Sequence, residues 1–265
     1  MSKKLLFGLI FLLATVGQTQ GALVGKEVTY KADDIELKGY IAYDDDTMIG
    51  KRPGVIVVHE WWGLNDYARI RADMLARAGY VALAVDMYGE GKQAEHPDDA
   101  GKFSAEVKNN LPMARKRFQA GVKVLRDNPF TNPERLAAIG YCFGGGVVLQ
   151  MARDGANLKG VVSFHGDLST SAPAKPGAIK AQILVFNGGA DKFTPLETIQ
   201  GFISEMIGAE ADFSFHSLPG ALHSFTNPKA DEFGKKFNLP LAYQEKADRE
   251  SWREMLDFFD LIFIK

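Results

Sequence analysis

The chain contains a single cysteine, Cys142, which lies in the sequence AIGYCFGGG. Gly140 and Gly144 flank it, so the motif G-x-C-x-G has the form of the nucleophile elbow G-x-S-x-G with cysteine in place of serine. In such an elbow a strand passes into a helix through a strained turn, and residues without a Cβ let the two elements approach. The turn places the sulfur at a helix N-terminus, where the dipole favours a thiolate. We predict that Cys142 is a nucleophile, and a buried, inert thiol is the alternative.

Two residues downstream have the types that a cysteine nucleophile needs as partners. Asp191 lies in VFNGGADKFTP, just after an apolar run, and His223 lies in LPGALHSFTNP, in a loop before the last predicted helix. The order nucleophile, acid, histidine is the one that accompanies this elbow. Asp167 also follows an apolar run and is the rival acid. We predict Asp191 as the acid and His223 as the base that it orients.

The other histidines have less specific settings. We expect His59 and His165, which follow apolar runs, to support the site, His96 to lie on the surface, and His216 to be structural in the alternating segment FSFHS. The chain has no spaced His/Cys cluster and no glycine-rich loop followed by Lys-Ser/Thr, so we predict no metal and no cofactor.

An α/β domain is predicted to position these residues. Residues 26–46 alternate polar and apolar on either side of a turn, which predicts a β-hairpin. Continuous apolar runs, typical of strands buried on both faces, follow at 55–58, 81–85, 136–139, 161–164 and 183–186. Helical patterns are found at 65–79, at 97–128 with a break near Pro112, and at 242–262.

The alternation of strands and helices predicts a doubly wound, mostly parallel sheet in one domain. In the helix at 65–79 we expect Tyr67, Ile70, Met74 and Ala78 to form the buried stripe. Ligands of such sheets bind beyond the carboxyl ends of the strands, where the candidate residues lie.

The N-terminus carries the pattern of a secretory signal peptide. Two lysines precede an apolar run from Leu5 to about Val16, and small and polar residues follow. We predict a signal peptide at 1–21, a domain at 26–265, and a periplasmic or secreted protein; an uncleaved N-terminal anchor is the alternative. Loss of residues 1–21 changes the net charge from −2 to −4, which gives no electrostatic reason to bind nucleic acid or a membrane. We expect a monomer without stable membrane association.

Five segments together resemble the dienelactone hydrolase family of α/β-hydrolases: VVHEWWGLND, AVDMYGEG, GYCFGGG, GGADKFTP and LHSFTNP. The resemblance covers about residues 26–262 and implies an α/β-hydrolase fold. It implies that Cys142 is the nucleophile, that His223 acts as general base and then acid, and that Asp191 orients it. It also implies that the carboxylate of Glu60 approaches the resting thiol and helps control its ionisation; an ion pair of Glu60 with a nearby Lys or Arg is the alternative.

The fold further implies an oxyanion hole made by the backbone N–H groups of Phe143 and Trp61. We expect an aromatic-lined cleft in which Trp62, Tyr88 and Phe225 contact the substrate, and no large lid domain. Members of the family that act on dienelactone bind the substrate carboxylate with an arginine after the D-x-Y stretch. Here that stretch is DMYGEGKQAEHP, in which we expect Lys92 to contact the substrate, as a point charge and not as the planar fork of an arginine.

The predicted function is hydrolysis of a small ester or lactone through an acyl-cysteine intermediate. Acyl transfer or thioester cleavage on the same three residues is an alternative, and a catalytically silent binding protein with this fold is another. A thiol redox sensor is disfavoured because the chain has no resolving cysteine.

Overall fold

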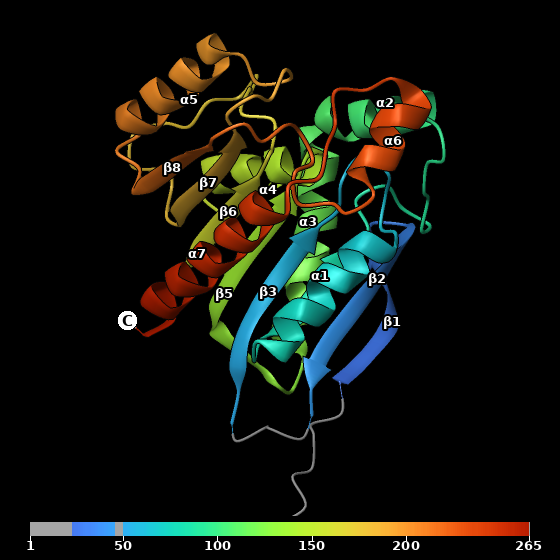
Figure 1. The fold of residues 1–265 in the computed structure, drawn as a ribbon. Coiled ribbons are helices and arrows are strands. Elements are labelled where there is room, and N and C mark those ends of the chain that lie inside the picture. Colours follow the sequence, from blue (N-terminus) through green and yellow to red (C-terminus); the bar gives the residue numbers. More distant parts are fainter. Residues whose placement is uncertain (1–22, 46–49, 265) are drawn as a thin grey trace, which may run out of the picture.

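Eight strands form one sheet in residues 23–45 and 50–264, which are the parts of the chain that the computed structural model describes (Figure 1). The predicted signal peptide lies outside these described residues. The strands are β1 (Leu23–Ala32), β2 (Ile35–Asp44), β3 (Arg52–Val58), β4 (Val81–Val85), β5 (Thr131–Tyr141), β6 (Gly160–Phe164), β7 (Gln182–Gly188) and β8 (Phe213–Leu218). Their order across the sheet is β1-β2-β4-β3-β5-β6-β7-β8. The strands β1 and β2 form an antiparallel hairpin, and β2 pairs antiparallel with β4. The other six strands are parallel to one another.

Helices cover both faces of this sheet. They are α1 (Asp66–Arg77), α2 (Pro97–Lys108), α3 (Leu111–Asp127), α4 (Phe143–Arg153), α5 (Leu196–Gly208), α6 (Ala230–Phe237) and α7 (Glu245–Ile264). The helices α1 and α7 pack on one face, and α3, α4 and α5 pack on the other (Figure 1). The predicted doubly wound, mostly parallel α/β fold is therefore confirmed.

The apolar runs are continuous because each strand has a covered side chain on both faces. In β3, Val55 and Val57 pack in the cluster under α1 and α7, whereas Ile56 and Val58 pack in the cluster under α3, α4 and α5. All four side chains are fully buried. Successive side chains of a strand point to opposite faces, so a strand between two helical layers needs apolar residues at every position.

The predicted buried stripe of α1 is confirmed at Tyr67, which is buried, and is wrong at Ile70. Ile70 is 54% exposed, and the buried face contains Arg71 instead, which is 3% exposed. The guanidinium of Arg71 is paired with Asp248 at 2.6 Å and donates to the carbonyl of Thr226 at 2.5 Å. A charged side chain can be buried when it has such partners. A search for apolar periodicity does not assign a charged residue to the buried face of a helix.

Two short helices lie over the carboxyl edge of the sheet. Figure 1 shows α2 and α6 next to each other beyond the ends of the strands. Their rings Phe103, Phe233 and Phe237 pack in one cluster with Trp61 and Trp62. These two helices cover the edge in place of a large lid domain.

Candidate active site

Cys142 lies in a strained turn between β5 and α4. Its backbone has φ +53° and ψ −117°, a left-handed conformation that costs a residue with a Cβ about 1–3 kcal/mol. A Cβ on Gly140 would come within 2.1 Å of the carbonyl oxygen of Gly144, and a Cβ on Gly144 within 2.3 Å of the carbonyl oxygen of Val58. The two glycines are therefore required by the close approach of strand and helix. The turn presents a partly exposed thiol at the N-terminus of α4.

His223 and Asp191 form a buried pair beside this thiol. Nδ1 of His223 lies 2.8 Å from Oδ2 of Asp191, and the other carboxylate oxygen of Asp191 accepts from the backbone N–H of Phe193 at 2.8 Å. The Asp191 side chain is fully buried. Because Nδ1–H donates a hydrogen bond to the carboxylate, Nε2 is the nitrogen of the imidazole that remains for Cys142.

The electrostatics of the pair favour a protonated imidazole. Burial disfavours the charged form, but the negative charge of Cys142 and hydrogen bonds to Asp191 and Cys142 outweigh it and raise the pKa of His223 to about 10. These contacts therefore favour a positive charge on the imidazole beside the sulfur of Cys142. The thiolate is the nucleophilic form of cysteine.

His165 supports the turn from behind. Its Nδ1 accepts from the backbone N–H of Cys142 at 3.1 Å, and its Nε2 lies 2.7 Å from the hydroxyl of Thr226. Burial and the nearby charges of His223 and Arg71 hold the pKa of His165 well below its usual range. A neutral ring with a proton on Nε2 satisfies both hydrogen bonds, so His165 holds the backbone of Cys142 without itself carrying charge.

The carboxyl group of Glu60 is hydrogen-bonded to the loop that carries His223. Its Oε1 accepts from the hydroxyl of Ser224 at 3.0 Å, and its Oε2 accepts from the amide of Asn227 at 2.6 Å. Burial raises the pKa of this carboxyl despite both hydrogen bonds. The two partners belong to the loop that carries His223, so the carboxyl group anchors this loop. Among the described residues it forms no ion pair with a lysine or arginine.

The two residues expected to form an oxyanion hole lie at the thiol. Trp61 and Phe143 line the same cavity as Cys142. Phe143 is the first residue of α4, so its N–H has no partner within the helix. The hydroxyl of Tyr88 donates to the carbonyl of Trp61 at 2.9 Å and thereby orients the peptide chain at this point.

A cavity of about 250 Å³ opens over the thiol. Its walls come from seven segments that lie far apart in the sequence. They are Trp61, Ser104, Lys108, Cys142, Phe143, Asp167, Phe193, Thr194, His223 and Leu241. The rival acid, Asp167, belongs to the wall of this cavity, where it pairs with Lys108 at 2.8 Å.

The four side chains predicted to contact the substrate lie outside this cavity. Trp62 is buried against the rings of Phe233 and Phe237 in α6, because its side chain points under the short helices. Lys92 is half-exposed and paired with Glu90, as expected for a cation on a surface turn.

The other two are buried. Tyr88 packs edge-on to His59 and supports Trp61 from below. Phe225 is fully buried against the ring of His165. Both aromatic side chains fill space behind the site, and the prediction that they line the cleft is corrected accordingly.

Other wall residues were missed by the sequence analysis. Phe193 follows Asp191 by two positions in GGADKFTP, and its ring contacts His223 with centroids 4.9 Å apart. It is 53% exposed. An aromatic residue two positions after a predicted acid was a signal in the sequence that could have identified it. Ser104 and Lys108 carry no such signal, because only the position of α2 over the sheet edge brings them to the thiol.

Comparison with known proteins shows the family to which this chain is related. The sequence profile of the dienelactone hydrolase family matches residues 37–263. The chain is 29% identical over 241 residues to the protein usf of Aquifex pyrophilus, covering 89% of this chain and 98% of that protein. It is 27% identical over 241 residues, with the same coverage, to a putative carboxymethylenebutenolidase of Aquifex aeolicus.

A solved structure is also similar along nearly its whole length. The dienelactone hydrolase-like promiscuous phosphotriesterase from metagenomic libraries is 33% identical, with a TM-score of 0.83, and the match covers 91% of this chain and 99% of that one. The profile match spans well over half of the chain. This protein belongs to the dienelactone hydrolase family of α/β-hydrolases.

Proposed function

We propose that this hydrolase cleaves a small carboxylic ester or lactone through an acyl intermediate on Cys142. The observation that carries the proposal is the placement of His223, which lies 2.8 Å from Asp191 and lines the same cavity as Cys142. This arrangement supplies a nucleophile and a proton donor at the mouth of one cavity of about 250 Å³. No cofactor takes part in the proposed reaction.

In the first step the Cys142 thiolate attacks the carbonyl carbon of the ester, and a C–S bond forms. The carbonyl oxygen takes up the negative charge and is stabilised by the N–H groups of Phe143 and Trp61. When the C–O bond to the alcohol breaks, Nε2 of His223 transfers its proton to the leaving oxygen. Asp191 keeps the imidazole in the required orientation throughout.

In the second step His223, now neutral, accepts a proton from water. As the proton leaves, the water oxygen attacks the carbonyl carbon of the thioester and a C–O bond forms. The C–S bond then breaks. Cys142 leaves as a thiolate, the acid product departs, and His223 again carries the proton. Transfer of the acyl group to an acceptor other than water would use the same groups with that acceptor in place of water.

The size of the cavity supports a small substrate. A cavity of about 150 Å³ with apolar walls holds a benzene molecule, so about 250 Å³ accommodates an ester group with one substituent of similar size. The name of the A. aeolicus relative, a putative carboxymethylenebutenolidase, supports a lactone as one such substrate. Lys108, the cation in the cavity wall, is paired with Asp167, which favours uncharged substrates.

The test is intact-protein mass spectrometry after acid quenching, within seconds of mixing with p-nitrophenyl acetate. We expect an acetyl adduct on the wild-type protein, release of nitrophenol, and neither with Cys142→Ala. Full turnover by Cys142→Ala would refute the mechanism. Absence of both adduct and turnover in the wild type, together with slow alkylation of Cys142, would support a silent binding protein instead.

We also propose that residues 1–21 direct export of the protein, on the signal-peptide pattern of the sequence. The N-terminal residue and mass of protein recovered from the periplasm or the medium test this. A full-length chain retained in the cytoplasm would contradict it.

A further inference from the structure

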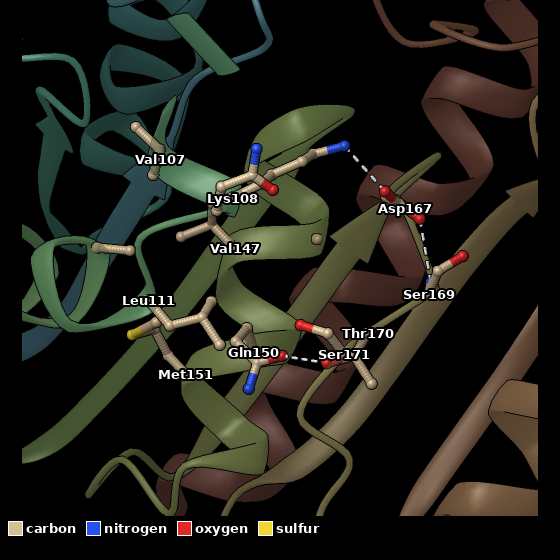
Figure 2. A pocket seen from close by; sticks show the side chains of 13 residues that line it. Val107, Lys108, Leu111, Val147, Gln150, Met151, Asp167, Ser169, Thr170 and Ser171 are labelled. Atoms are coloured by element: carbon tan, nitrogen blue, oxygen red, sulfur yellow. Dashed lines mark hydrogen bonds and ion pairs between the residues drawn. The ribbon is translucent and has the colours of Figure 1, made fainter. Parts of the chain in front are cut away.

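A second cavity of about 220 Å³ lies next to the catalytic one. Figure 2 shows it between the end of α2, the start of α3, one side of α4 and the loop after Asp167. One wall is apolar and consists of Val107, Leu111, Val147 and Met151. Neither the family resemblance nor the proposed chemistry assigns a role to this compartment.

The two cavities share one wall. Lys108 and Asp167 line both of them, and their side chains are joined at 2.8 Å (Figure 2). The pair is 45% and 40% exposed, and an ion pair exposed to this degree contributes little to stability. It can therefore separate at low cost, and the two compartments then form one continuous site.

The chemistry of the second cavity favours a neutral, apolar group. Two of its polar side chains already have hydrogen-bond partners: the hydroxyl of Thr170 donates to Oε1 of Gln150 at 2.6 Å, and Nε2 of Gln150 donates to the carbonyl of Ala172 at 3.3 Å. The charge of Lys108 is balanced by Asp167. Binding is therefore most favourable for an apolar group that covers the apolar wall and removes it from water.

The position of His223 indicates which part of an ester enters this cavity. His223 must face the leaving oxygen, and its ring contacts Phe193, so the alcohol part lies on the Phe193 side. The acyl part then extends along the first turns of α4 toward Lys108 and Asp167. We propose that the second cavity binds the tail of a medium-length, uncharged acyl chain, and that the Lys108–Asp167 pair is the partition it passes; this rests on the proposed function.

The volume sets the length of the chain. A cavity of about 150 Å³ holds the six carbons of benzene, so about 220 Å³ accommodates a tail of about six carbons. An octanoyl ester would place the carbons nearest the carbonyl in the catalytic cavity and the rest in the second one.

The experiment compares kcat/KM for p-nitrophenyl octanoate and p-nitrophenyl acetate, and the readout is the octanoate-to-acetate ratio. Leu111→Trp fills the second cavity from α3 and should lower the ratio by about tenfold or more. Val122→Trp is the matched control, because Val122 lies on the same helix, is also partly exposed and faces a different cavity. Its ratio should stay within about twofold of wild type. Lys108→Met removes the partition charge and should raise the ratio by about threefold or more.

A ratio within about twofold of wild type in Leu111→Trp, or an equal fall in Val122→Trp, would overturn the inference. If circular dichroism shows that Leu111→Trp is unfolded, Lys108→Met decides, and an unchanged or lower ratio there overturns it. A wild type that turns over acetate but not octanoate also overturns it and leaves the proposed function intact. No acyl adduct with either ester would refute the proposed function and the acyl site together.

Discussion

Replacing Cys142 with alanine should return His223 to an ordinary titration. In the wild type, burial lowers the pKa of His223, but the charge of Cys142 and the contacts of Asp191 raise it to about 10. A unit charge at about 4 Å contributes about 4 kcal/mol at an effective dielectric constant of about 20, which corresponds to about three pKa units. The pKa of His223 in Cys142→Ala should therefore be about 7.

The assay is NMR titration of the imidazole nitrogens in both proteins. We expect His223 of the wild type to stay protonated through neutral pH and to lose its proton only as the pH rises through about 10. Because the proton on His223 is needed by the leaving oxygen, the acylation rate should fall over the same pH range. A pKa near its ordinary value in both proteins would show that no ion pair forms. A pKa of about 10 for His223 in both proteins would show that Asp191, and not Cys142, keeps the imidazole protonated.

Four further substitutions test the supporting structure. Asp191→Asn removes a charge-assisted hydrogen bond of about 1.5–3 kcal/mol and should lower kcat by about 10- to 150-fold; unchanged steady-state kinetics would contradict this. Thr226→Val leaves the buried Nε2 of His165 without its partner at 2.7 Å and should lower the free energy of unfolding in urea by about 1–3 kcal/mol, so an unaltered midpoint would count against the assigned network. Gly140→Ala places a Cβ 2.1 Å from a carbonyl oxygen and should lower the free energy of unfolding by about 3 kcal/mol or more. Gly201→Ala adds a Cβ in α5 that meets no atom within 4 Å beyond its chain neighbours and the nearby backbone of its own helix, so it should raise the free energy of unfolding by about 0.5–1 kcal/mol. Equal effects of the two glycine changes on thermal unfolding would refute the packing argument.

The arrangement of the candidate catalytic residues was accessible from the sequence for a physical reason. Parallel strands of one sheet end at the same edge, so Cys142, Asp191 and His223, each just beyond an apolar run or before the last helix, had to lie near that edge. The elbow glycines follow from the same geometry, since strand and helix approach too closely for a Cβ. Local pattern was sufficient here because the constraint acts on the backbone.

The walls of the cavity were not accessible in this way. Trp61 and Trp62 are neighbours in the sequence, yet one lines the cavity and the other packs under α6. Which ring faces the thiol depends on the turn and on the helix that covers it. Arg71 illustrates the same limit, because its burial depends on Asp248, which lies far away along the chain.

The sequence by itself determined the class of fold, the order of the candidate catalytic residues and the glycines of the elbow, because these depend on periodicity and on backbone space. Tertiary structure alone decided that Glu60 anchors the loop of His223 through Ser224 and Asn227, and that Lys108 and Asp167 meet between two cavities. Side-chain partners from separate elements are chosen by packing and charge, and no local pattern encodes the distance between those elements.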